Sequence, residues 1–282
     1  MRKYIVTLSC RDRLGIVAAV SHLFAETGTN IDESQQFSDA DRGMFFMRVA
    51  VSAPEALDRD TFHAQFLPIA AEFDMRWEIV DAAHHPRALV MVSKFDHCLV
   101  DLIYRCQTNS LNMDIAGVIS NHEVGRQWSE NANLPYHYRP GGAAAQAENE
   151  QFLLDQIEAE NIELVILARY MQVLSPELAA RLNGRVINIH HSFLPSFKGA
   201  VPYSRAYERG VKMIGATAHF VTPDLDEGPI IAQGIADIRH DMTIEAVVDV
   251  GRDVERNVLA RAVRLFTERR ILLNGQKTVI FD

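Results

Sequence analysis

Three polar side chains in the second half of the sequence could act together on a small carbonyl group. Asn188 and His190 lie two residues apart in an apolar run that predicts a short buried strand, so their side chains project to the same face. An amide N–H and a protonated imidazole can hold a developing oxyanion. A carboxylate such as Asp226 favours the charged imidazole and can orient it or hold a water. Together the three residues suit acyl transfer at a small carbonyl.

Motifs of the common covalent and zinc-dependent hydrolases do not occur in the sequence. There is no G-x-S-x-G nucleophile motif and no H-E-x-x-H zinc motif. The adjacent residues His84 and His85 have no further ligand close by in the sequence, and we interpret them as linker rather than as a metal site. We therefore expect neither a metal ion nor a covalent nucleophile.

The elements that must position these side chains alternate between strands and helices from Arg87 onward. This alternation predicts a mostly parallel, Rossmann-like sheet with helices on both faces. Such sheets bind ligands at the carboxyl ends of their strands, so the loops after these strands should line one crevice. The expected strands are 88–92, 113–119, 164–168, 185–189, 213–221 and 229–238, and the expected final helix is 243–269.

The first 81 residues follow a different order. Apolar and polar residues alternate in four stretches, and two helical patterns separate the first strand from the second and the third from the fourth. The order strand, helix, strand, strand, helix, strand predicts a ferredoxin-like domain. We expect this domain at 1–83, a linker at 84–87 and the second domain at 88–282.

The bulk composition is that of a water-soluble globular protein. The net charge of −9 argues against a nucleic-acid partner, which needs a basic surface. No apolar run reaches the length of about 20 residues that spans a bilayer, and no signal-peptide core is present. The thiols Cys10, Cys98 and Cys106 form no C-x-x-C pair and are expected to be unpaired. These features predict a cytoplasmic protein with no membrane partner.

Two motifs in the second domain resemble the folate-dependent formyltransferase family. They are the segment from Asn188 to Gly199, which reads N-I-H-H-S-F-L-P-S-F-K-G, and the segment 226–231, which reads D-E-G-P-I-I. The resemblance covers about residues 87–270 and implies that Asn188, His190 and Asp226 form the catalytic triad. It further implies folate-binding positions at Arg169, Tyr170, Met171, Gln172, Val173, Leu174 and Leu225, and a supporting position beside the triad at His219. His191, directly after His190, is a second candidate for a supporting position. His219 could equally be a packed strand histidine.

Two departures from glycinamide ribonucleotide transformylases bear on the acceptor of the formyl group. Those enzymes hold the substrate phosphate on a Gly/Ser/Asn-rich loop after their first strand, whereas Ser93–Leu99 here contains no glycine and carries Phe95 and Asp96. His191 also stands where the transformylases usually have proline. A nucleotide phosphate should be poorly received at this loop, which leaves water as the nucleophile.

The N-terminal domain resembles the ACT family of regulatory domains. The resemblance rests on the segment 11–17, which reads R-D-R-L-G-I-V, and on Asn30 and Ile31. It implies an amino-acid effector held between Asp12 and Gly15 of one chain and Asn30 and Ile31 of a neighbour, because a helix N-terminus offers free N–H groups to a carboxylate. The alternative is that Asp12 only caps the helix and Gly15 only permits close packing. Pairing through this domain would give a homo-oligomer, either a dimer or a tetramer.

An ACT domain followed by a formyltransferase-fold domain with an altered phosphate loop resembles the formyltetrahydrofolate deformylase family. The resemblance implies hydrolysis of 10-formyltetrahydrofolate to tetrahydrofolate and formate, which feeds formate to one-carbon and purine metabolism and balances the folate pool. No cofactor is expected beyond the folate substrate itself. The alternatives are formyl transfer to an amine such as glycinamide ribonucleotide, and a catalytically silent sensor of folate or of an amino acid.

Overall fold

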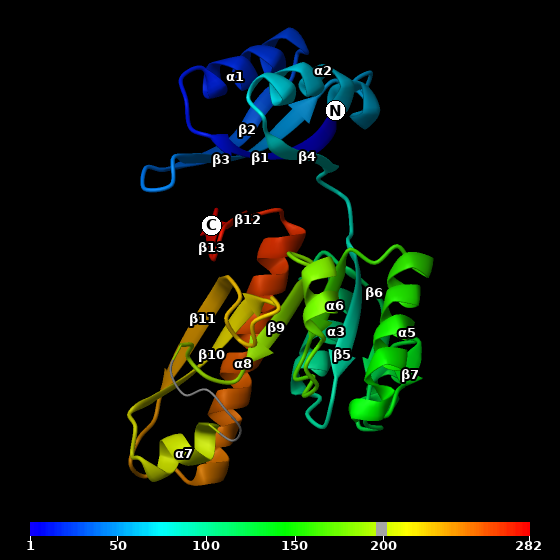
Figure 1. Ribbon diagram of the computed structural model, residues 1–282, viewed down its shortest axis with the longest axis vertical. Helices are drawn as coiled ribbons and strands as arrows, with labels where there is room; N and C mark the ends of the chain where they lie inside the picture. Colours follow the sequence, from blue (N-terminus) through cyan, green and yellow to red (C-terminus); the bar gives the residue numbers. More distant parts are fainter. Residues whose placement is uncertain (196–201) are drawn as a thin grey trace. The chain divides into compact units, whose positions relative to one another are not determined.

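The computed structural model describes residues 1–195 and 202–282, whose contacts divide the chain into two units (Figure 1). Unit 1 comprises Met1–His84, Glu268–Asn274 and Val279–Asp282. Unit 2 comprises His85–Thr267 and Gly275–Thr278. The predicted domain boundaries, 1–83 and 88–282, placed all of the C-terminal residues in the second domain, whereas some of them pack with the N-terminal residues in unit 1. The motif residues Ser196, Phe197, Lys198 and Gly199 lie outside the described residues.

Unit 1 has the expected ferredoxin-like architecture. Its four strands form an antiparallel sheet in the order β2-β3-β1-β4. The last strand begins at Arg76, because Phe73 caps α2 and Asp74 adopts a left-handed backbone, with φ 50°. The elements are β1 (Arg2–Arg11), α1 (Ile16–Glu26), β2 (Asn30–Asp39), β3 (Met44–Ala53), α2 (Arg59–Glu72) and β4 (Arg76–Asp81).

The C-terminal residues form a hairpin that the sequence reading missed, made of β12 (Ile271–Asn274) and β13 (Lys277–Ile280). Gly275–Thr278 of this hairpin belong to unit 2, and the residues on either side belong to unit 1. Val279 and Phe281 are buried against Phe46 of β3. Phe46 alternates along its strand with residues of the main unit 1 core, so it faces the other side of the sheet. The hairpin was missed because it is short and far in sequence from the strand that it covers.

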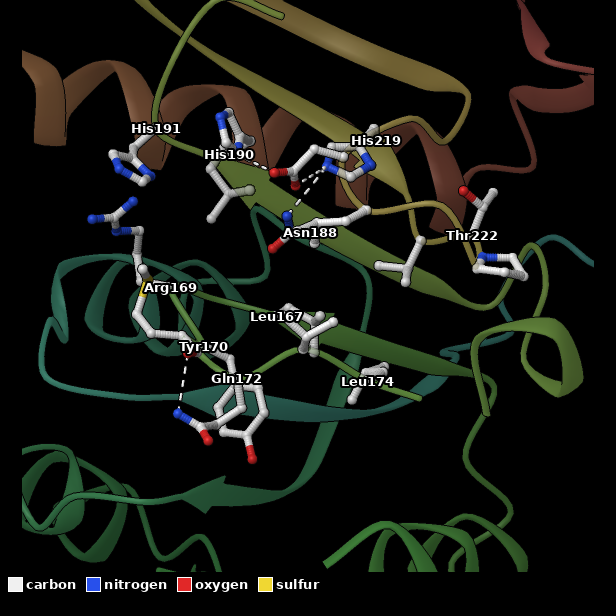
Figure 2. A pocket seen from close by; sticks show the side chains of 17 residues that line it. Leu167, Arg169, Tyr170, Gln172, Leu174, Asn188, His190, His191, His219 and Thr222 are labelled. Carbon is white, nitrogen blue, oxygen red and sulfur yellow. Dashed lines mark hydrogen bonds and ion pairs between the residues drawn. The ribbon is translucent and has the colours of Figure 1, made fainter. Parts of the chain in front are cut away.

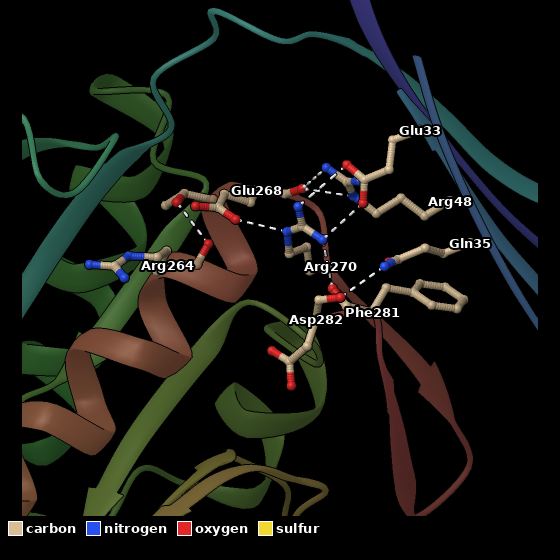
Figure 3. Close-up of polar contacts among 9 residues, drawn as sticks. Glu33, Gln35, Arg48, Arg264, Glu268, Arg270, Phe281 and Asp282 are labelled. Carbon is tan, nitrogen blue, oxygen red and sulfur yellow. Dashed lines mark hydrogen bonds and ion pairs between the residues drawn. The ribbon is translucent and has the colours of Figure 1, made fainter. Parts of the chain in front are cut away.

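Buried polar contacts join the same segment to the sheet (Figure 3). The Arg48 side chain is 4% exposed, and its Nη1 lies 3.3 Å from a carboxylate oxygen of Glu33. Its Nε and Nη2 donate to the carbonyl oxygen of Glu268 at 3.2 and 3.1 Å. Arg270 also pairs with Glu33 at 3.3 Å, and the Gln35 amide donates to the Asp282 carbonyl at 2.8 Å. Arg48 is thus a buried cation that ties the C-terminal segment to the sheet.

Replacement of Arg48 by alanine should lower the free energy of unfolding of unit 1 by about 2 kcal/mol, because the Glu268 carbonyl loses both hydrogen bonds from the guanidinium and Glu33 keeps Arg270 but not Arg48 as a charged partner. The matched control is Arg59→Ala, whose side chain is 63% exposed and pairs loosely with Asp60. Urea unfolding followed by the fluorescence of Trp77, in a Trp128→Phe background, reports on unit 1. Equal losses in the two variants would contradict the assigned role of Arg48.

Unit 2 is built on a seven-stranded sheet in the order β11-β10-β9-β8-β5-β6-β7. The strands β5, β6, β7, β8 and β9 are parallel, and β10 and β11 run antiparallel at one edge. The mostly parallel sheet expected for the second domain is therefore confirmed. The elements are β5 (Arg87–Val92), α3 (His97–Gln107), β6 (Asp114–Ser120), α4 (Arg126–Asn131), β7 (Tyr136–Tyr138), α5 (Gln146–Ala159), β8 (Leu164–Leu167), α6 (Pro176–Arg181), β9 (Val186–His190), α7 (Pro202–Glu208), β10 (Met213–Phe220), β11 (Ile230–Asp237) and α8 (Ile244–Thr267).

The carboxyl ends of the parallel strands meet in one place, as the sequence predicted. The Ser93 hydroxyl, just after β5, donates to the side-chain oxygen of Asn121 after β6 at 2.7 Å. The same hydroxyl accepts a hydrogen bond from the backbone N–H of Met171 after β8 at 3.0 Å. One serine therefore holds together the loops after three strands at the edge where a ligand is expected.

The three cysteines are unpaired, as expected. Cys10 and Cys98 are buried, and Cys106 is partly exposed. Burial raises the pKa of the Cys106 thiol to about 12. Among the described residues, no helix combines the length and the apolar character that a bilayer crossing requires.

Candidate active site

Asn188 and His190 lie side by side on β9, at the point where the sheet changes from parallel to antiparallel pairing. Val186 and Ile187 are fully buried, and the strand continues into the loop at His191. In the register with β10, Asn188 lies opposite His219 and His190 lies opposite Thr217. The register therefore brings His219 to the same site as the two residues that the sequence singled out.

Asp226 reaches this site from the loop between β10 and β11. Its Oδ2 lies 3.4 Å from Nδ1 of His190, and its Oδ1 lies 3.6 Å from Nε2 of His219. The backbone at Asp226 is left-handed, with φ 56°, a conformation that aspartate tolerates better than most residues. Gly228 permits the loop to return to the sheet, since a Cβ there would lie 1.7 Å from the carbonyl oxygen of Phe220. The left-handed backbone at Asp226 and the absence of a Cβ at Gly228 thus place the Asp226 carboxylate in the site.

His219 orients the amide of Asn188. Its Nδ1 lies 2.9 Å from the carbonyl oxygen of Phe220, and a carbonyl can only accept, so this nitrogen carries the proton. In the neutral ring Nε2 is then left to accept from the Asn188 Nδ2 at 3.2 Å. One N–H of the Asn188 amide is thereby fixed and the other remains for a ligand. We missed this contact in the sequence, where His219 could only be named as a nearby histidine.

The electrostatics of the site favour a charged Asp226 paired with His190 (Figure 2). Burial by itself would raise the pKa of Asp226, but the lowering effects, of which the hydrogen bond from His190 is the largest, outweigh burial and hold this pKa far below its usual value. His190 turns its other nitrogen, Nε2, into a buried position with no hydrogen-bond partner among the described residues. A buried ring nitrogen left open in this way is placed to exchange a proton with a reactant.

His191 differs from its neighbour although the two rings are only 5.3 Å apart. Burial, reinforced by the charge of Arg169, lowers the pKa of His191 to about 3. The ring is therefore neutral at physiological pH and does not act as a proton carrier. Of the two adjacent histidines, His190 is the one that can do proton chemistry.

The lowered pKa of His191 predicts that the free energy of unfolding decreases at acidic pH and that His191 causes part of this decrease. Its folded-state pKa of about 3 lies below the unfolded value of 6.5, so the stability it contributes is complete above about pH 6.5 and is lost as the pH falls toward 3. At about pH 5 the loss should be about 2 kcal/mol relative to about pH 7.5. Urea unfolding of His191→Asn at both pH values should show this part of the loss removed, whereas the exposed control His240→Asn should keep it. Equal pH dependence in the two variants would contradict the assignment.

A cavity runs from this polar cluster along an apolar wall. Met171, Val173 and Leu225 are 51%, 60% and 62% exposed, an unusual degree for apolar side chains that line one cavity. The structure brings all the predicted folate-binding positions to the lining, together with Asn188, His190, His191, His219 and Asp226. The lining suits a largely apolar ligand whose reactive group lies at the polar end.

Arg169 lines the same cavity but points away from the rest of the predicted folate-binding segment. Figure 2 shows its guanidinium beside His191, on the opposite side from Tyr170 and Gln172. The Nε of Arg169 lies 3.2 Å from the buried carboxylate of Glu255 on α8. The sequence reading missed Glu255. The available signal was a charge four residues after Gly251 and eight after Val247, on the face of α8 that is buried.

The predicted effector residues do not form a site within one chain. Asp12 follows the end of β1 that pairs with Met44, whereas Asn30 pairs with Ser52 at the other end of β3. Eight residues of extended strand separate the two places by roughly 26 Å. Asp12 does not cap α1, because its carboxylate accepts from the Ser38 hydroxyl and the N-cap residue of the helix is Gly15, with φ 97° and no side-chain cap.

Comparisons with known proteins agree with this architecture. The family model described as Formyl transferase matches residues 86–263, and the ACT domain model matches residues 4–59. A crystal structure of glycinamide ribonucleotide transformylase 1 from Symbiobacterium toebii, 29% identical, covers 71% of this chain and 95% of its own, with a TM-score of 0.65. That similarity leaves about the N-terminal third of the chain unmatched.

Several proteins match over almost the whole chain, and two of them serve as examples. Formyltetrahydrofolate deformylase from Bacillus subtilis is 46% identical over 277 residues, covering 98% of this chain and 92% of that protein. The crystal structure of formyltetrahydrofolate deformylase from Burkholderia mallei is 49% identical, covers all of both chains and superposes with a TM-score of 0.96. Full-length similarity at this level, over both domains and in the same order, means that the chain belongs to the formyltetrahydrofolate deformylase family.

Proposed function

We propose that this protein hydrolyses 10-formyltetrahydrofolate to tetrahydrofolate and formate. The observation that carries the proposal is the cluster of Asn188, His190 and Asp226 at the polar end of an apolar cavity, in a chain that belongs to the deformylase family. Asn188 and His190 line the polar end of the cavity, where a formyl group would lie if the folate ring occupied the apolar part. The steps proposed below use side chains of this chain and call on no cofactor.

The proposed mechanism is a direct attack of water on the formyl carbon. His190 takes a proton from water at Nε2 while its Nδ1–H is held by the Asp226 carboxylate. The free N–H of Asn188, whose amide is oriented by His219, stabilises the oxyanion of the tetrahedral intermediate. Protonated His190 then gives its proton to N10, the bond between carbon and N10 breaks, and formate and tetrahydrofolate leave.

Transfer of the formyl group to a phosphorylated amine is the less favoured function. The loop after β5 carries Asp96, whose carboxylate accepts from the indole N–H of Trp128 at 2.9 Å, and Phe95, which is 40% exposed. A fixed carboxylate and a bulky ring in the place of a phosphate-binding loop repel and obstruct a nucleotide phosphate. The loop therefore supports water as the acceptor.

For unit 1 we propose pairing with a second chain and binding of an amino acid between the two. Leu14 is 99% exposed and Ile31 is 38% exposed, so each of the two separated parts of the predicted effector site carries an apolar side chain open to a partner. A neighbour that brought Asn30 and Ile31 against Gly15 would complete the site. The molar mass in solution tests this, and a monomer that stays monomeric with every amino acid added would contradict it.

A reducing compartment suits the three unpaired thiols, and we propose that the enzyme works in the cytoplasm. Fractionation of cells that express the native chain, with immunodetection of each fraction, tests the location. Recovery of the protein outside the cytoplasmic fraction would contradict it.

The assay that tests the function follows formate from purified protein and 10-formyltetrahydrofolate in the absence of any amine. We expect formate and tetrahydrofolate in equal amounts, with no requirement for glycinamide ribonucleotide. The Asn188→Ala variant serves as the matched control for contaminating hydrolysis, because it removes the oxyanion donor from a folded protein. Formyl transfer only after glycinamide ribonucleotide is added would overturn the proposed function.

A further inference from the structure

A cluster of buried polar side chains lies beside the active site and plays no part in the proposed mechanism. Glu255 is 1% exposed, and its carboxylate accepts from the Tyr203 hydroxyl at 2.7 Å and lies 2.9 Å from Nε2 of His97. Arg169 supplies the opposite charge at 3.2 Å. Burial of a charged pair costs desolvation free energy, which ion pairing and hydrogen bonds offset only in part. Stability alone therefore does not explain why these buried polar side chains are present.

The backbone at Arg169 is strained in a way that glycine would avoid. Its φ is 64°, in the left-handed region, where a long side chain costs of order 1 kcal/mol. The guanidinium carbon of Arg169 lies 5.4 Å from the centre of the Phe95 ring, and its Nη1 has no hydrogen-bond partner among the described residues. A strained position that keeps an arginine in the cavity indicates that this side chain has a function there.

The space around the cluster is filled to van der Waals contact. The Tyr203 ring occupies the place of a Cβ at Gly251, which would lie 2.4 Å from its Cζ. The rings of Tyr203 and His191 are 6.3 Å apart in an edge-on arrangement. Because His191 adjoins His190, the cluster begins directly beside the reacting group.

The same side chains could be considered as a metal site, and the charges argue against it. His97, Cys98 and Glu255 offer ligand atoms within 4.8 Å of one another. The Arg169 guanidinium already neutralises Glu255, and burial raises the pKa of the Cys98 thiol well above its usual value. A cation would have to displace an arginine and bind a protonated thiol.

We propose that Arg169, held by Glu255 and Phe95, closes the side of the active site opposite the folate and thereby restricts the nucleophile to water. The proposal rests on the proposed function, because it assumes that the folate lies along Tyr170–Leu174. A formyl acceptor larger than water would have to approach the formyl carbon from the opposite side, past His191, where the guanidinium lies. Arg169 is thus assigned to nucleophile selection, in place of the folate contact that the sequence implied.

The test removes the Arg169 side chain from this side of the active site and supplies a small amine that can compete with water. Arg169→Gly relieves the left-handed backbone, and Glu255→Gln removes the carboxylate that would lose its partner. With 10-formyltetrahydrofolate and an excess of glycinamide, the amine nitrogen would form a bond to the formyl carbon, the bond to N10 would break, and N10 would take up the proton from the amine. We expect the ratio of N-formylglycinamide to formate, measured by mass spectrometry, to rise at least about 10-fold over wild type.

Arg252→Ala is the matched control. Arg252 also approaches Phe95, at 5.9 Å, but its side chain is 41% exposed and pairs with Asp249 outside the cavity. This variant should release formate alone, as wild type does. If the double variant does not fold, Phe95→Ala replaces it, since this exposed ring supports the guanidinium and its loss should raise the same ratio to a smaller extent.

The outcomes separate this proposal from the proposed function. Formate as the sole product of an active Arg169→Gly/Glu255→Gln enzyme, or of Phe95→Ala where the double variant does not fold, would overturn nucleophile selection and leave hydrolysis standing. A wild-type enzyme that releases no formate would overturn the proposed function instead. An equal rise in the Arg252→Ala control would also count against Arg169, because it would show that any change near Phe95 admits the amine.

Discussion

Replacement of His190 by glutamine should reduce kcat for formate release about 10³-fold or more, with little change in stability. Glutamine can keep a hydrogen bond to Asp226, but it cannot take a proton from water or give one to N10. The effect should appear in kcat rather than KM, because His190 acts on the reacting atoms. Steady-state formate release, with unfolding measured in parallel, provides the test.

His191, the residue after His190, provides the matched comparison for the His190→Gln variant. His191→Asn should keep kcat within about 10-fold of wild type, because the pKa of His191 near 3 keeps its ring neutral in both ground and transition states. Similar losses in the two variants would show that burial and packing, rather than proton transfer, account for the effect at His190. The reverse order of effects would contradict the assignment of the proton carrier.

Replacement of Asp226 by asparagine should reduce kcat by about 10²-fold to 10³-fold. Asparagine fits the left-handed backbone at this position and has the same shape, so the substitution removes only the charge that pairs with His190. Since the pKa of Asp226 is held far below its usual value, the carboxylate in wild type stays ionised throughout the neutral and mildly acidic range. Loss of activity on acidification from neutral to mildly acidic pH therefore should not come from Asp226.

Asp224→Asn is the control for this substitution. Asp224 is exposed in the same loop, and its backbone carbonyl accepts from the Thr222 hydroxyl at 3.1 Å and from the Glu227 N–H at 3.3 Å. Its kcat should match wild type. An Asp226→Asn enzyme with wild-type kcat, or an Asp224→Asn enzyme with the same loss, would mean that the charge beside His190 is not needed.

The sequence predicted those parts of the site that depend on local patterns. Two polar residues at alternate positions of an apolar strand necessarily face the same way, so Asn188 and His190 could be paired without a structure. Asp226 could be placed only through the family resemblance, because its approach depends on a left-handed backbone and on the space left by Gly228. The fold class followed from the order of the elements for the same local reasons.

The residues that the sequence did not reveal act through contacts between distant segments. Glu255 lies on the last helix and meets His97 and Tyr203 from two other parts of the chain, and periodicity could mark it only as an unexplained charge on a buried face. The C-terminal segment packs in unit 1 because Arg48 and Phe46 on β3 contact it, Arg48 at Glu268 and Phe46 at Val279 and Phe281. Contacts of this kind depend on tertiary packing, which no local pattern records.

The central claim is that water attacks the formyl carbon in this site. The most direct measurement is the isotopic composition of formate released from 10-formyltetrahydrofolate in water enriched in oxygen-18, with an excess of glycinamide present. We predict formate that carries one oxygen atom from the solvent, in amounts equal to tetrahydrofolate, and no formylated amine from the wild-type enzyme. Formate without solvent oxygen, or tetrahydrofolate produced together with a formylated amine, would contradict the account.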